Sequence, residues 1–184
     1  RVVEEMQLEI TLKEQSLGAV ADESLWGSIY KDHPYGNSPL GNKESLESLK
    51  REDLIAFFST YYVTQNAVIS IVGDLEKVDA IELSEKLSEK MPQGKPPKPI
   101  PDVTIPAGLT TIIDKQSKQT HIRLGQVGIS RNETDYFPLL VGNHVLGGNS
   151  LVSVLFQEIR EKRGLSYSTY SYFVPMEKRG PFVV

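Results

Sequence analysis

The chain has 184 residues, 39% of them hydrophobic, which is sufficient for a sizeable core in one or two domains. It contains no cysteine, which excludes disulfides and thiolate zinc sites, and its net charge of −4 without a basic run argues against nucleic acid as a partner. No apolar run reaches the roughly 18 residues of a membrane-spanning helix, so we expect a soluble protein, with no indication of its compartment.

Residues 1–91 are mostly helical by pattern. In the range 51–62, for example, Leu54, Ile55, Phe58 and Tyr61 recur at the spacing of one buried helix face. An uninterrupted apolar run that ends in a glycine indicates instead a buried strand. Helices are predicted over 1–30, with a break at 16–18, and over 44–49, 51–62 and 76–90, and the strand over 67–72.

Residues 92–106 contain six of the eleven prolines and show no apolar period. Proline-rich sequence is stiff and extended, so this segment is expected to be a linker between domains. The pattern beyond it predicts strands over 109–113 and 120–129 and a helix over 134–146, which Gly147-Gly148-Asn149-Ser150 is expected to end.

The run from Leu151 to Tyr172 is the most informative part of the sequence. Leu151, Val154, Leu155 and Ile159 mark one face of a helix that Gly164 is expected to stop in a left-handed conformation. The period then changes to two, which predicts a strand over 167–174. Arg160 lies off the apolar stripe and Tyr167 opens the strand, so both are expected to point outward from the ends of regular elements. A further strand is predicted over 182–184.

One segment within this run, E-I-R-E-K-R-G-L-S-Y-S (158–168), resembles the hallmark of the second domain of the pitrilysin/insulinase family of zinc metallopeptidases, which includes mitochondrial processing peptidase. The segments 33–36 (His-Pro-Tyr-Gly), 72–74 (Val-Gly-Asp) and 147–150 extend the resemblance over nearly the whole chain. In that family an Arg and a Tyr at this spacing contact the substrate peptide, which implies a substrate-binding role for Arg160 and Tyr167.

The element pattern alone predicts an α+β fold. The resemblance implies mixed β-sheets covered by helices, as in the two-domain fold of processing peptidases. It further implies that residues 1–91 are the C-terminal half of a first, zinc-type domain, that 92–106 link it to a second, and that 107–184 are the N-terminal half of that second, substrate-contacting domain.

Zinc hydrolysis needs about three protein ligands and an open position for water. The family supplies its ligands from an H-x-x-E-H helix and a distant Glu, and this sequence has no H-x-x-E-H. His33, His121 and His144 have no second ligand at helical spacing. His33 is interpreted as part of a surface turn, and His121 and His144 as partly buried structural residues. We therefore expect no catalytic residue and no bound metal in this chain alone. By the resemblance, Glu9 matches the third zinc ligand of a parent protein, although Glu4, Glu5, Glu9 and Glu14 equally fit a solvated helix face.

Two functions remain open at this point. The first is an internal part of a zinc metalloendopeptidase that binds and hydrolyses peptides or unfolded polypeptides in a chamber between two domains. The second is a peptide-binding subunit without metal, paired in a homo- or heterodimer with an active family member. An H-x-x-E-H upstream of Arg1 would distinguish them. The sequence indicates neither the substrate nor the cleavage preference.

Overall fold

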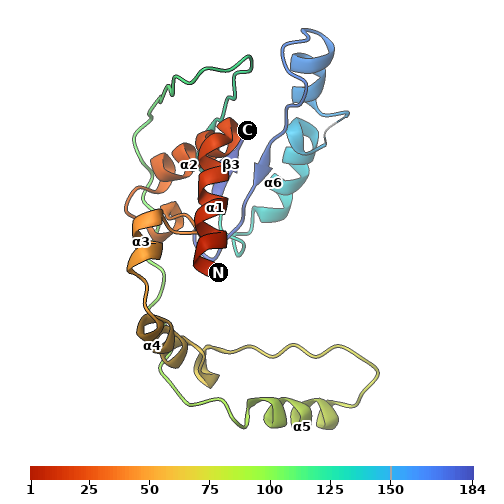
Figure 1. The fold of residues 1–184 in the computed structure, drawn as a ribbon. Coiled ribbons are helices and arrows are strands. Elements are labelled where there is room, and N and C mark those ends of the chain that lie inside the picture. Colours follow the sequence, from red (N-terminus) through yellow and green to blue (C-terminus); the bar gives the residue numbers. More distant parts are fainter. Residues whose placement is uncertain (150) are drawn as a thin grey trace. The chain divides into compact units, whose positions relative to one another are not determined.

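The computed structural model describes residues 1–149 and 151–184. They form two compact units, one made of residues 1–43 and 100–184 and the other of residues 44–99, which are described separately. The elements are α1 (Val2–Gln15), α2 (Leu17–Tyr30), η1 (Pro34–Gly36), α3 (Lys43–Ser48), α4 (Arg51–Tyr61), η2 (Thr64–Asn66), α5 (Lys77–Ser88), β1 (Gly125–Val127), α6 (Tyr136–Asn143), η3 (His144–Gly148), η4 (Phe156–Glu161), β2 (Tyr172–Phe173) and β3 (Pro181–Val183) (Figure 1). The predicted α+β class is confirmed.

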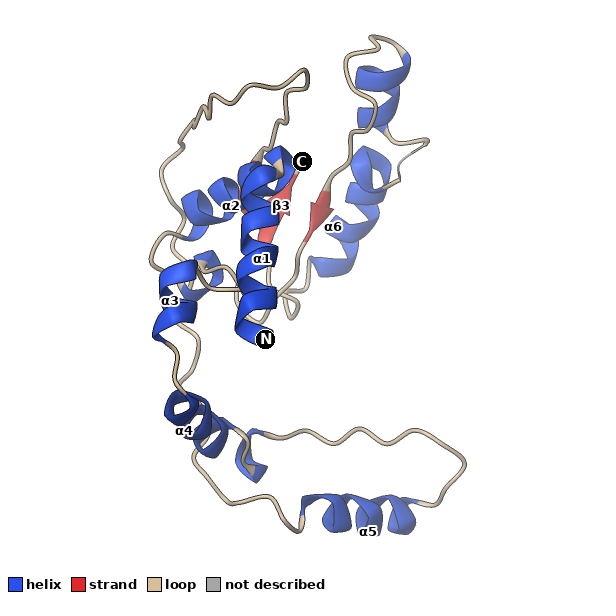
Figure 2. Cartoon of the chain, viewed as in Figure 1, coloured by secondary structure: helices blue, strands red, loops and turns tan. Residues whose placement is uncertain are grey.

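The first unit is built on a small antiparallel sheet with the order β1–β3–β2. Val183 of β3 is 1% exposed and pairs with Gly125 on one side and Tyr172 on the other. A Cβ added to Gly125 would lie 2.9 Å from Leu25 and Ile29, so α2 packs directly on this face of the sheet. Since neighbouring residues of a strand point to opposite faces, Ser171, next to Tyr172, faces the other side, where α6 lies (Figure 2).

The predicted break between the first two helices is confirmed. Ser16 has an extended backbone (φ −84°, ψ 111°), and its hydroxyl accepts a hydrogen bond from the Ala19 N–H at 3.4 Å as the N-cap of α2. Tyr30, at the end of α2, is buried, and its hydroxyl donates to the Arg179 carbonyl at 3.0 Å. Burial raises the pKa of this hydroxyl well above its ordinary value, with a smaller contribution from Tyr35. Tyr30 therefore remains a neutral donor that ties α2 to the turn before β3.

The second unit contains the predicted helices α4 and α5 and a small core around Val63, which is 2% exposed. The Thr64 N–H donates to the Pro92 carbonyl at 3.0 Å, so residues after α5 return to cover Val63. A Cβ added to Gly94 would lie 2.5 Å from a Val63 methyl group, which leaves room only for glycine there. No helix in the described ranges is both long and apolar enough to cross a membrane.

Two predicted strands are wrong. Residues 67–72 and 109–113 are extended but unpaired, and Val68 and Val72 are 96% and 95% exposed. Of the strand predicted over 120–129, Gly125–Val127 forms β1, and backbone hydrogen bonds to Val184 and Gly180 continue the pairing from Leu124 to Ile129. The apolar pattern indicates β propensity, but a strand needs a neighbour for its backbone hydrogen bonds, and the described residues supply one only for β1, β2 and β3.

Other boundaries also differ from the predictions. The helix expected to end at Gly147 continues through Gly148 as the π-helical turn η3, and Asn149 is the first extended residue after it. Ser150, the last residue of that predicted stop, lies outside the described residues. The next helix is π-helical over residues 156–161. Of the strand predicted over 167–174, Tyr172–Phe173 forms β2, and the Val174 N–H donates one more backbone hydrogen bond to Pro181 of β3.

Candidate functional site

The predicted substrate-contacting residues lie on a segment that projects from the end of α6 and returns to β2 (Figure 1). We call this segment, residues 155–171, the arm. It contains η4, a turn at Gly164 and an extended return, and its tip is open to solvent, with Leu165 75% and Tyr167 89% exposed. π-Helical turns inside helices occur frequently at functional sites. The arm is therefore a candidate binding site.

The structure brings Arg160 and Tyr167 together. The guanidinium carbon of Arg160 lies 5.8 Å from the centre of the Tyr167 ring, which is within the range of a cation–π interaction. This cation–π contact is the side-chain interaction that the structure shows for Arg160 and Tyr167. Within residues 1–149 and 151–184, neither side chain takes part in an ion pair or a hydrogen bond. The guanidinium donors and the phenol hydroxyl thus remain available to a ligand.

The neighbouring charged residues on the arm are occupied differently. Arg163 donates to the Glu158 carbonyl at 2.8 Å and lies 3.3 Å from the Glu158 carboxylate. Lys162 also pairs with that carboxylate, and its ammonium holds the pKa of Glu158 below its usual range. These pairs join Glu158 of η4 to the two residues that follow η4, so they brace this end of the helix. Among the cations of η4 and the turn after it, Arg160 is the one without a carboxylate partner among the described residues.

Gly164 has the predicted left-handed conformation, with φ at +62°. Its N–H donates to the Arg160 carbonyl at 3.0 Å, and the next N–H, of Leu165, donates to the Ile159 carbonyl at 3.1 Å. These bonds satisfy carbonyl groups at the end of η4 and reverse the chain. The reversal is the local reason why Tyr167, seven residues after Arg160, comes back alongside it.

Glu9 lies on the exposed surface of α1. No group of three or more His, Cys, Asp or Glu side chains that could hold a metal ion occurs in the parts of the chain that the structure describes. A zinc site needs about three protein ligands, and residues 1–149 and 151–184 do not by themselves bring such a set together. Glu9 can contribute at most one ligand to a site completed by other residues.

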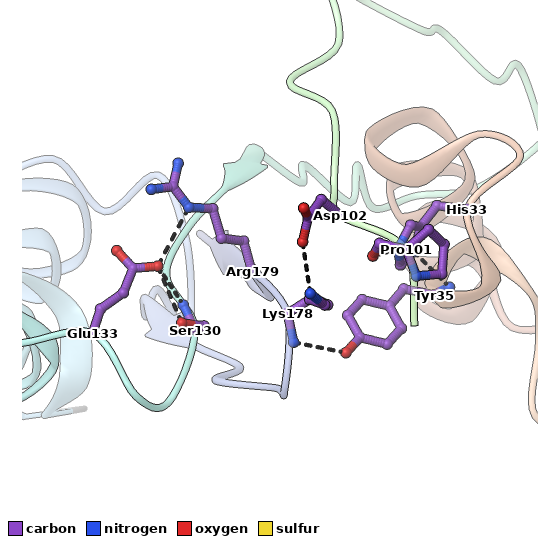
Figure 3. A network of polar contacts seen from close by, with 8 residues as sticks. All are labelled: His33, Tyr35, Pro101, Asp102, Ser130, Glu133, Lys178 and Arg179. Atoms are coloured by element: carbon purple, nitrogen blue, oxygen red, sulfur yellow. Dashed lines mark hydrogen bonds and ion pairs between the residues drawn. The ribbon is translucent and has the colours of Figure 1, made fainter. Parts of the chain in front are cut away.

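A second polar cluster surrounds the loop after α2 (Figure 3). His33 Nε2 lies 3.0 Å from the Pro101 carbonyl, and its Nδ1 accepts from the Tyr35 N–H at 3.1 Å, which requires the tautomer with the proton on Nε2. The Tyr35 hydroxyl accepts from the Lys178 N–H at 3.0 Å, and the Lys178 ammonium pairs with Asp102 at 2.6 Å. The side chains in this cluster are engaged with one another or with the backbone, so we assign it a structural role. Both other histidines, His121 and His144, are exposed rather than partly buried as expected.

Sequence reasoning missed one pair of residues that bears on the arm. Asn143, in the last turn of α6, and Ser171, at the end of the arm, are 7% and 1% exposed and bond to each other through both side chains. No one-dimensional pattern pairs residues 28 positions apart, so the sequence carries no signal for this contact.

Comparison with known proteins gives the family. The model of the peptidase M16 inactive domain matches residues 48–184. The chain belongs to the peptidase M16 family. Over 88% of its length it is 31% identical to an uncharacterized zinc protease of Rickettsia bellii, and over 96% it is 30% identical to the uncharacterized zinc protease YmxG of Bacillus subtilis. It spans 39% and 42% of the lengths of these two relatives.

Solved structures agree with this M16 assignment. A crystal structure of a peptidase M16 inactive domain from Pseudomonas fluorescens superimposes on the whole chain with a TM-score of 0.95 at 35% identity, and the chain covers 44% of it. A protease from Helicobacter pylori has the same fold, with a TM-score of 0.82 at 22% identity over 98% of this chain and 45% of that one. The resemblance carried by residues 158–168 is thereby confirmed at the level of family and fold.

Proposed function

We propose that this M16 chain carries the substrate-binding residues of a zinc metalloendopeptidase, and that Arg160 and Tyr167 bind the peptide. The observation that carries the proposal is the arrangement of this pair on the exposed arm. A guanidinium is a planar, permanently charged fork of donors, which suits a peptide carbonyl or carboxylate. The phenol adds one hydroxyl at the end of a stiff ring.

The contrast with Arg163 supports the choice of residues. Arg163 is bonded to Glu158, whereas the contact given for the Arg160 guanidinium is an aromatic ring, which leaves its N–H groups free to donate. Backbone contacts of this kind hold peptides of many sequences. We therefore infer a broad rather than a sequence-specific peptide or unfolded-polypeptide substrate.

The hydrolytic centre lies outside this chain in the proposal. The relatives are named zinc proteases, and Glu9 is proposed as the third zinc ligand beside an H-x-x-E-H segment of a longer parent protein. The division of that parent into two domains at residues 92–106, with a peptide chamber between them, belongs to the same proposal. In the parent, Glu9→Gln is expected to lower zinc content and activity without changing the fold, while Glu5→Gln, one turn earlier on α1, changes neither. If elemental analysis shows the same zinc content in the Glu9→Gln and Glu5→Gln proteins, Glu9 is not a zinc ligand.

The binding role of Arg160 and Tyr167 is tested by titration of a fluorescently labelled, unstructured casein peptide into the full-length protein. Arg160→Ala and Tyr167→Phe are expected to weaken binding by about 0.5–3 kcal/mol each, with the larger loss for the charged donor. Tyr170→Phe is the matched control on the same arm and should leave the affinity unchanged. Unchanged peptide affinity together with a large fall in melting temperature for Arg160→Ala or Tyr167→Phe would mean that the pair serves packing.

A non-catalytic, metal-free partner subunit is the second candidate. Under this candidate too, Glu9 has no companion ligands among the described residues. Zinc content of the full-length protein separates the two: one zinc per chain supports the peptidase, and peptide binding without zinc supports the partner subunit. In the second case we expect a dimer with an active family member.

A further inference from the structure

The buried pair Asn143 and Ser171 lies where the arm joins the rest of its unit. The Ser171 hydroxyl donates to Asn143 Oδ1 at 2.6 Å, and Asn143 Nδ2 donates to the Ser171 carbonyl at 3.0 Å. The Ser171 N–H donates to the Gly147 carbonyl at 3.0 Å. All three polar groups of Ser171 are therefore satisfied by one stretch of chain, the end of α6 and the turn η3.

The other end of the arm meets the same turn. A Cβ added to Gly147 would overlap the Ser171 hydroxyl and would lie 2.7 Å from a methyl carbon of Leu155. Leu155 and Ser171, the first and last residues of the arm, thus both contact Gly147, which is buried and can only be glycine at this spacing. We call Asn143, Gly147 and Ser171 the anchor.

Local bonds brace the arm between these two ends. Glu158 of η4 pairs with Lys162 and Arg163, which directly follow η4, and the N–H groups of Gly164 and Leu165 close the turn with two backbone hydrogen bonds. The long-range hydrogen bonds that the structure gives to the arm among the described residues meet at Ser171. A braced segment held at both ends on one turn takes its direction from that turn, so the anchor sets where Arg160 and Tyr167 point.

We propose that Asn143, Gly147 and Ser171 are positioning residues for peptide binding, which act through Arg160 and Tyr167 without touching the peptide. Neither side chain of the Asn143–Ser171 pair reaches the surface, with exposures of 7% and 1%, so neither is a ligand group itself. Buried side-chain pairs that satisfy each other fully hold one arrangement, because an unsatisfied alternative is costly. This inference rests on the proposed function of the arm and adds the device that orients it.

The decisive variant is Ser171→Ala in the full-length protein, which removes the hydroxyl and leaves Asn143 Oδ1 buried without its donor. We expect the dissociation constant of the labelled casein peptide to rise about threefold to thirtyfold, at a temperature well below the melting transition. Ile129→Val, in the core of the same unit at 8% exposure, is the control for general destabilisation and should leave the constant unchanged. An equal rise of the dissociation constant in the Ile129→Val protein would overturn the proposal.

A second measurement separates positioning from stability. In protein that already carries Arg160→Ala and Tyr167→Phe, adding Ser171→Ala should change the dissociation constant by less than about twofold, since effects that act through the same groups do not add. A full additional rise in that background would show that the anchor acts elsewhere. If Ser171→Ala does not fold, Ser171→Cys, with a thiol of similar size that is a weak donor, should give a smaller rise in the same direction, and no rise would count against the anchor.

The two proposals fail in different ways. If Arg160→Ala and Tyr167→Phe alone leave peptide binding unchanged, the proposed function of the arm is wrong. If they weaken binding while Ser171→Ala does not, the anchor is structural only and the function of the arm stands.

Discussion

Gly180 has almost no room for a side chain. It precedes β3, and a Cβ added to it would lie far inside van der Waals contact with the carbonyl oxygen of Val174 and 2.9 Å from its carbonyl carbon. Both atoms belong to the backbone of Val174, which directly follows β2, so they cannot rotate away as a side chain would. Gly180→Ala therefore has to separate the two chain segments.

The cost follows from what that separation disturbs. Three backbone hydrogen bonds hold the region: Gly180 N–H to the Ile129 carbonyl at 3.1 Å, Gly128 N–H to the Gly180 carbonyl at 2.7 Å, and Val174 N–H to the Pro181 carbonyl at 3.0 Å. Loss of one such bond costs about 0.5–1.5 kcal/mol, and overpacking a tight site costs about 1–3 kcal/mol. We expect Gly180→Ala to lower the free energy of unfolding of the first unit by about 1.5–4.5 kcal/mol.

Urea unfolding followed by the fluorescence of Trp26, the single tryptophan, measures this change. Trp26 lies 5.5 Å from the Tyr30 ring, and Tyr30 bonds to Arg179, so the signal reports the unit that contains Gly180. Gly142→Ala in α6 is the matched control, because nothing lies within 4 Å of its added Cβ and alanine favours helix by up to about 1 kcal/mol. A Gly180→Ala protein within about 0.5 kcal/mol of the wild type, or an equal loss in Gly142→Ala, would refute the reasoning.

Two further predictions concern Gly164 and Glu133. Gly164→Ala should destabilise the arm by about 1–2 kcal/mol because an L residue is strained at φ +62°, and Gly164→Asn should cost less. Local amide hydrogen exchange measures both effects, and equal protection of the two variants and the wild type would contradict this prediction. The pKa of Glu133 is lowered, first by the Ser130 N–H and further by Arg179. The ionised Glu133 carboxylate therefore stabilises the fold above the unfolded pKa of about 4.3, and this contribution is lost as the pH falls through the lower folded pKa. Glu133→Gln should therefore lower the melting temperature at neutral pH and flatten its fall between about pH 5 and 3, and an unchanged acid profile would rule this out.

Local signals in the sequence were sufficient for the helices and for the candidate residues. The break at Ser16, the helices around Phe58 and Leu83 and the left-handed stop at Gly164 depend on caps, periodicity and the missing Cβ of glycine, all of which act within a few residues. The motif at 158–168 likewise singles out Arg160 and Tyr167 from sequence alone, because a motif records residue types at fixed spacing. Their roles in peptide binding stay predictions.

Contacts between distant residues were decided only by the tertiary structure. Residues 67–72 and 109–113 have the composition of strands and yet do not pair, since strand formation depends on a partner backbone that local sequence does not specify. The same holds for the anchor: Asn143 and Ser171 are ordinary polar residues until folding buries them against each other, where leaving either unpaired would be costly. The sequence by itself determined the helices, the turn that reverses the arm and the family of the chain, whereas the sheet and the contact between Asn143 and Ser171 came from long-range pairing.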